Sequence, residues 1–196
     1  MHLLLNRIGG YLFDMLPGVA AAGVLFGLLS RRRAARLAER RLTSSRGREC
    51  VLLLFWLFCG GLAMLTLTPP DFHWLEVLRN GYFFSWRALL HLSAWNLIPF
   101  RTLGQSRMIF VGNLVMFVPF GLAEAALWRG GSWKRAVGLG LAVSGGIECF
   151  QLLVGRNFDI DDLLLNTLGV LCGHGLWRAA ESLLPPLRGA LYCRKK

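Results

Sequence analysis

Apolar residues in this chain form five long blocks, separated by short polar or basic segments. The blocks cover residues 11–29, 51–67, 108–128, 136–154 and 162–179. At about 1.5 Å of rise per residue, a helix of this length crosses a hydrocarbon core of roughly 30 Å. Because the apolar residues come in blocks and not in the periodic stripe of a soluble helix, the pattern predicts an all-α protein, a polytopic transmembrane bundle of about five spans.

Basic residues predict the orientation of these spans. The chain has 22 Lys and Arg against 11 Asp and Glu, and 55% of its residues are hydrophobic. The basic residues concentrate in residues 31–48, in residues 129–135 and at the C-terminus, whereas only Arg7 precedes the first block. The positive-inside rule places the N-terminus outside and the C-terminus in the cytoplasm, and these flanks are the reverse of a secretory signal peptide.

The arginine-rich segment, residues 31–48, contains no aromatic residue on which a base could stack. We therefore interpret it as a cytoplasmic loop and expect no nucleic-acid partner. The five cysteines include no CxxC pair, and we expect them to act as small hydrophobic residues without a disulfide framework.

An aromatic segment, residues 71–107, connects the second and third blocks. Pro69 and Pro70 end the second span, because proline cannot continue the helical hydrogen-bond ladder. Tryptophan, tyrosine and phenylalanine recur through the segment, which predicts an interfacial or re-entrant stretch at the outer face. The predicted organisation is two spans with the arginine-rich loop in residues 1–94, a membrane core in residues 95–179 and a basic cytoplasmic tail in residues 180–196.

Polar side chains gather where the fourth and fifth blocks meet, within residues 145–173. They are Glu148, Gln151, Arg156, Asp159, Asp161, Asp162 and Asn166. An ionisable residue beside a membrane-length apolar segment is a functional-site hypothesis by default. Helical rise places Asn113 of the third block in the same shallow layer as Glu148, Gln151 and Asn166, so three helices contribute to one site.

Small residues predict where the helices pack closely. The stripe in the fourth block is Gly138, Ala142 and Gly146. In the fifth block Gly169 and Gly173 continue the face that carries Asp162 and Asn166. Because small residues let a neighbouring helix approach, these polar side chains are expected to point into the bundle and away from lipid.

Three interpretations of the polar cluster stay open. In a structural one, Asp159, Asp161 or Asp162 caps the fifth helix and Arg156 forms a salt bridge. In a second, these aspartates and Glu148 bind Mg²⁺ or Ca²⁺, although the run lacks the glycine and the final glutamate of an EF-hand loop. In the third, an outward-facing pocket uses Arg156 for an anionic head group, and a carboxylate for proton transfer or hydrogen bonding.

No sequence motif of a known hydrolase, nucleotide-binding loop or zinc protease is present. The four histidines, His174 among them, lie in unrelated contexts, and we expect interfacial or packing roles for them. The catalytic candidates are therefore Glu148, Asp159 and Asp162 alone. We expect no cofactor and assign no metal site.

Three stretches resemble the VanZ-like family of bacterial membrane proteins. They are N-L-I-P-F at residues 96–100, G-N-L-V-M-F-V-P-F-G at 112–121, and the E-x-x-Q, G-R-x-F-D-I-D-D and N-T-L-G elements within 148–169. The resemblance covers residues 95–173 and leaves out the first two spans and the arginine-rich loop. The positions that it transfers as a ligand site are Asn96, Asn113, Glu148, Gln151, Arg156, Asp159, Asp162 and Asn166.

The resemblance implies a multi-pass protein of the bacterial cytoplasmic membrane, linked to resistance to the glycopeptide antibiotic teicoplanin. It implies no catalytic mechanism. We expect a pocket for a lipid head group, a lipid-linked wall precursor or an amphiphilic glycopeptide antibiotic. The alternatives are a small transferase or hydrolase that acts on a phosphorylated lipid, and a non-catalytic accessory subunit of an envelope complex.

Overall fold

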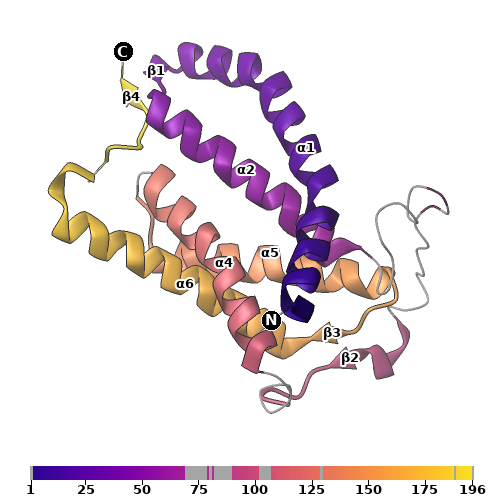
Figure 1. Cartoon of the computed structure of the whole chain (residues 1–196). Helices are drawn as coiled ribbons and strands as arrows, with labels where there is room; N and C mark the ends of the chain where they lie inside the picture. The colour runs from indigo at the N-terminus through magenta and orange to yellow at the C-terminus, as the bar shows by residue number, and fades with distance from the viewer. Residues whose placement is uncertain are drawn as a thin grey trace. The chain divides into compact units, whose positions relative to one another are not determined.

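The computed structural model describes residues 2–68, 79, 81, 90–101, 107–128, 130–187 and 189–195. Over these residues the fold is helical, with five long helices: α1 His2–Glu39, α2 Arg46–Leu67, α4 Arg107–Leu127, α5 Trp133–Leu153 and α6 Ile160–Leu183 (Figure 1). All but α6 contain a stretch long and apolar enough to cross a membrane. The prediction of a helical membrane protein is confirmed.

The chain divides into two compact units. Unit 1 comprises Met1–Tyr82 with Cys193–Lys196, and unit 2 comprises Phe83–Tyr192. In unit 1, α1 and α2 form a hairpin (Figure 1). Gly18 and Gly60 lie at the crossing, where a Cβ on either glycine would collide with the carbonyl oxygen of the other. The helices pack this closely because neither residue has a side chain.

The arginine-rich segment is mostly helical, which corrects the prediction of a loop. α1 continues through it to Glu39, and α2 begins at Arg46, capped by the Ser45 side chain, which accepts a hydrogen bond from the Arg48 N–H. The connection contains only a turn and the short strand β1 Leu42–Thr43, which pairs antiparallel with β4 Arg194–Lys195. Arginine, alanine and leucine are strong helix formers, and their propensity extends α1 beyond its apolar block.

Unit 2 is built around α6, which packs against both α4 and α5. The predicted close approach at Gly169 and Gly173 is confirmed, since a Cβ there would collide with the Leu114 and Val118 carbonyl oxygens of α4. Gly121 of α4 makes the reciprocal approach to the α6 backbone. This tight contact explains why one face of α6 is buried although the helix carries several polar residues.

The packing face predicted for α5 is wrong. Gly138 and Gly146 are exposed, and a Cβ on either would meet no atom within 4 Å. The buried face is offset by two residues from the predicted one. Its members are spaced by four, and they are Ala136, Gly140, Ser144 and Glu148. Small residues occupy both faces of the helix, so their spacing alone could not identify the one that contacts α6.

A short parallel pairing joins the segment before α4 to the start of α6. β2 Trp95–Asn96 pairs with β3 Phe158–Asp159, and the Trp95 and Phe158 rings stack with centroids 5.0 Å apart. Of the aromatic segment, residues 71–107, the structure describes only residues 79, 81, 90–101 and 107. The prediction of an interfacial or re-entrant stretch therefore falls mostly outside the described residues. The pairing places Asn96 beside Asp159, at the end of the bundle where α5 ends and α6 begins.

Candidate functional site

Asp159 is the central residue of the candidate site. It is the N-cap of α6, and its Oδ1 accepts hydrogen bonds from the Asp161 N–H at 2.9 Å and from the Asn96 side-chain amide at 3.0 Å. The Asp159 N–H in turn donates to Glu148 Oε2 at 3.0 Å. The capping role that the structural interpretation predicted is therefore confirmed at Asp159, and the same residue links Glu148 of α5 to the β2 segment.

Asp161 anchors the loop that follows β2. It is 2% exposed, and its Oδ1 accepts a hydrogen bond from the Phe100 N–H. Phe100 has a φ of 67°, a left-handed conformation that is unfavourable for a bulky residue. The bond to Asp161 helps to hold this loop against the start of α6 in a conformation that Phe100 would otherwise avoid.

Asp162 connects the site to α4. Its Oδ1 accepts a hydrogen bond from the Asn113 side-chain amide. Asn113 and Glu148, which were predicted to share one polar layer, both lie at this end of the bundle. The contact from the fifth block comes from Asp162 and not from the predicted Asn166. We call the group of Asn96, Asn113, Glu148, Arg156, Asp159 and Asp162 the polar site.

Arg156 supplies positive charge to the polar site. It lies in the turn between α5 and β3, half-buried, and its backbone N–H donates to the Gln151 carbonyl oxygen at 2.9 Å. Its charge interacts favourably with Glu148 and Asp162, while Asp159 and Asp162 repel Glu148. Gln151 is buried at the end of α5, one turn from Glu148. The charge of Arg156 thus partly offsets that of the neighbouring carboxylates.

Asn166 lies apart from these contacts. It is 4% exposed, and its side-chain amide donates to Ser144 Oγ of α5 at 2.9 Å. The Asn166 side-chain oxygen is buried and has no hydrogen-bond partner among the described residues. The bond to Ser144 joins α5 and α6 one turn below the polar site, and it has the geometry of an interhelical lock.

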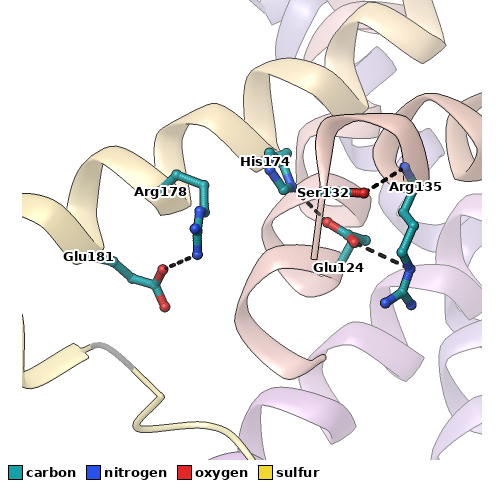
Figure 2. Close-up of polar contacts among 6 residues, drawn as sticks. All are labelled: Glu124, Ser132, Arg135, His174, Arg178 and Glu181. Carbon is teal, nitrogen blue, oxygen red and sulfur yellow. Dashed lines mark hydrogen bonds and ion pairs between the residues drawn. The ribbon is translucent and has the colours of Figure 1, made fainter. Parts of the chain in front are cut away.

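A second polar cluster occupies the other end of unit 2 (Figure 2). Glu124 of α4 is buried between His174 of α6, whose Nδ1 lies 2.7 Å from Glu124 Oε2, and Arg135 of α5, whose Nε lies 3.8 Å from Oε1. Further along α6, Arg178 Nη1 donates to Oε2 of the buried Glu181 at 2.9 Å. We call these five residues the Glu124 cluster.

Sequence reasoning did not find the Glu124 cluster as a unit. Glu124 and His174 are fifty positions apart along the chain, and neither belongs to a motif. The available signal was a buried carboxylate near the end of an apolar helix, which requires a partner. Sequence reasoning also missed Ser144, because only the packing of α5 against α6 shows that this residue lies on the buried face of α5.

Metal binding finds no geometric support in the described part of the chain. Within it, no group of three or more His, Cys, Asp or Glu side chains is arranged to hold an ion. Asp159 and Asp162 each direct one oxygen to a side-chain amide, that of Asn96 and that of Asn113.

A comparison with protein families matches residues 55–183 of this chain to the VanZ/LLP1 model. No curated protein and no solved structure matches the chain. The match begins inside α2, which corrects the expectation that both of the first spans lie outside the resemblance. It contains every residue of the polar site and covers well over half of the chain. The arrangement of α4, α5 and α6 around these motifs is therefore that of a membrane protein which belongs to the VanZ/LLP1 family.

Proposed function

We propose that this protein binds the polar head group of an envelope amphiphile, a membrane lipid or a lipid-linked wall precursor, at the polar site of unit 2. The observation that carries the proposal is the collection of Glu148, Asp159 and Asp162 with Arg156 in one electrostatic cluster, at the end of a bundle of apolar helices. Charges at such a position are costly without a role, and a ligand is the role that their chemistry favours.

The charge balance favours a head group with hydroxyl or amine donors beside a phosphate. Glu148, Asp159 and Asp162 each use one oxygen for bonds within the protein. Their second oxygens make no hydrogen bond to any residue that the structure describes, so they are acceptors for a ligand. Arg156 adds a planar cation that matches a phosphate. A phosphorylated sugar or glycerol head group carries both kinds of complementary group.

The location of the proposed activity is the outer face of the bacterial cytoplasmic membrane. This follows from the predicted orientation with the N-terminus outside and the C-terminus inside. Resemblance to VanZ-like proteins links the activity to teicoplanin resistance, and binding of either the wall precursor or the antibiotic at the polar site would account for that link. The alternatives are a transferase or hydrolase acting on a phosphorylated lipid, and an accessory subunit without a ligand.

The test compares Glu148→Gln and Arg156→Ala with the wild-type protein at matched membrane levels. Both positions border the polar site, and neither substitution empties a large apolar volume. Matched controls are Glu39→Gln and Arg36→Ala, which remove the same charges from exposed positions on α1. The measurements are co-purified lipids by mass spectrometry, teicoplanin susceptibility and the thermal melt of the purified protein.

Loss of the bound amphiphile and of the resistance phenotype in both site variants, with a melt like that of the controls, is the expected result. A changed lipid or precursor species in cells that express the wild type would favour the enzyme instead. If both variants keep full binding and the full phenotype, the proposal of a ligand pocket at the polar site is wrong. The accessory subunit without a ligand would then be the remaining alternative.

A further inference from the structure

A cavity lies at the arginine-rich end of the α1–α2 hairpin, in unit 1 and away from the polar site in sequence. Its volume is about 550 Å³. Its lining combines basic, hydroxyl and apolar side chains: Ser30, Arg31, Arg33, Ala34, Leu37, Ala38, Leu42, Thr43, Ser44 and Glu49. We infer that this cavity binds a phosphate-bearing anion, and that the head group of an anionic membrane lipid is its source.

Arg33 is the residue that points to a ligand. Its Nη2 donates to Glu49 Oε2 at 2.6 Å, and its guanidinium carbon lies 3.9 Å from the centre of the Phe26 ring. Its Nε and Nη1 are buried and have no hydrogen-bond partner among the described residues. Buried N–H groups without an acceptor are unfavourable, and a phosphate oxygen in the cavity would satisfy them after a small rotation of this long side chain.

The charges around the cavity also favour an anion. The lining contains two arginines, Arg31 and Arg33, and one carboxylate, Glu49. Oε1 of Glu49 accepts a hydrogen bond from the Ser44 hydroxyl at 2.6 Å. The strand β1, which contributes Leu42 and Thr43 to the lining, pairs with β4, which carries Arg194 and Lys195. The cavity is therefore surrounded by more cations than its single carboxylate offsets, and Arg31 is exposed and free to reorient toward a ligand.

The apolar part of the lining favours a lipid over a soluble phosphate. Ala34, Leu37, Ala38 and Leu42 lie beside the arginines, so a molecule with a charged head and an apolar neighbour fits the whole surface. Both helices that form the cavity are long and apolar enough to cross a membrane. Arg31 and Arg33 follow the apolar block of α1 within four residues, which favours a position near head-group level. Basic clusters next to membrane-spanning helices attract anionic lipids.

This site is separate from the family motifs. The matched family region begins at residue 55, after the last residue of the lining, Glu49. Failure of either site in an experiment therefore leaves the other untouched.

The test uses the purified full-length protein with phosphatidylcholine vesicles that contain or lack phosphatidylglycerol, and with inorganic phosphate and glycerol 3-phosphate as soluble competitors. Arg31→Gln should weaken binding to the phosphatidylglycerol vesicles about fivefold, the loss expected for one hydrogen bond of about 1 kcal/mol to the phosphate in the cavity. Arg33→Gln together with Glu49→Gln should weaken it about tenfold while keeping a neutral, hydrogen-bonded pair. The matched control is Arg32→Gln, which removes an exposed charge outside the lining and should change binding less than about twofold.

Glu49→Gln alone should strengthen binding severalfold, because it removes the carboxylate that competes with the phosphate. Competition by glycerol 3-phosphate at the same site would identify a free phosphate ester as the source, and its absence would identify the lipid head group. Equal losses for Arg31→Gln and Arg32→Gln would overturn the inference, since binding would then depend only on diffuse surface charge.

Discussion

The polar site and the Glu124 cluster, at opposite ends of the same three helices, match their charges differently. In the Glu124 cluster each carboxylate lies within ion-pair distance of a cation or an imidazole. In the polar site, Asp159 and Asp162 repel Glu148, and the charge of Arg156 only partly offsets the three carboxylates. The paired charges of the Glu124 cluster hold helices together, although Oε1 of Glu124 and of Glu181 is buried without a hydrogen-bond partner among the described residues. Unbalanced charge, as in the polar site, is typical of sites that bind a ligand.

The two clusters also differ in the secondary-structure elements that contribute their residues. The residues of the Glu124 cluster come from α4, α5 and α6 themselves, near helix ends that pack on one another. The polar site adds two non-helical parts, the β2 segment with Asn96 and the turn with Arg156. Connecting segments tolerate rearrangement better than packed helices, so the polar site is the better place for a group that must admit a ligand.

Removal of Glu124 should give the largest effect on stability. Glu124→Ala leaves the buried His174 ring without its acceptor, and breaking a buried pair from one side costs about 3–5 kcal/mol. Chemical denaturation of the purified protein in detergent measures this loss. Glu39→Ala, at an exposed position, should stay within about 0.5 kcal/mol of the wild type. A Glu124→Ala protein that keeps its stability but loses the bound amphiphile would show that this cluster contributes to ligand binding and not to stability.

Removal of the cap should affect both stability and binding. Asp159→Ala leaves the Asp161 N–H and the Asn96 amide without their acceptor, and loss of an N-cap costs about 1–2 kcal/mol. Asp159→Asn keeps an acceptor oxygen, so it should recover most of the stability while still lacking the charge. Denaturation and lipid co-purification separate the two effects. Complete recovery of binding by Asp159→Asn would show that the charge of this residue is not used.

The bond between Asn113 and Asp162 should contribute less than the cap. A double-mutant cycle of Asn113→Ala and Asp162→Ala should give a coupling of about 1 kcal/mol, because hydrogen bonds between membrane helices are weak on average. The same cycle on Ser144 and Asn166 serves as the comparison, with about 0.6 kcal/mol expected for a bond between neutral groups. A larger coupling for the Ser144 pair would contradict the greater contribution assigned to the carboxylate.

The orientation of the two clusters across the membrane can be tested with almost no effect on stability. Asn157 is exposed in the turn beside the polar site, and a cysteine there in a cysteine-free background should react with a membrane-impermeant maleimide added outside intact cells. A cysteine in place of the exposed Lys134, in the first turn of α5 beside the Glu124 cluster, should react only after the cells are opened. The reverse pattern would overturn the predicted orientation and move the polar site to the cytoplasmic face.

Several features of the polar site were predictable from local rules. An aspartate before an apolar helix predicted an N-cap, and Asp159 has that role. Helical rise predicted that Asn113, Glu148, Gln151 and Asn166 share a layer, because it converts sequence position into depth. Asn113 and Glu148 lie at the polar site, whereas Asn166 lies one turn away and contacts Ser144. Asn96 was expected in the site only from the family resemblance, since a two-residue strand pairing leaves no periodic pattern in the sequence.

Other features depended on contacts that local rules do not contain. The buried face of α5 runs through Gly140 and Ser144, although Gly138 and Gly146 offer an equally small surface. The choice follows from α6, since a Cβ on Gly140 would lie 2.9 Å from the Thr167 Cα. The orphaned nitrogens of Arg33 became visible for the same reason, because α2 places Glu49 against only one edge of the guanidinium.

The sequence alone singled out residues 145–173 as a candidate site, because an apolar block has a length and a charge has a cost wherever the chain folds. The partners of those charges were not, because they depend on which helix faces which. Helix packing left Glu148, Asp159 and Asp162 with one arginine at one end of unit 2, and gave Glu124 an imidazole and a cation at the other. Pairing is a property of three-dimensional contact, and it separates the charge-balanced Glu124 cluster from the polar site, where we propose that a ligand binds.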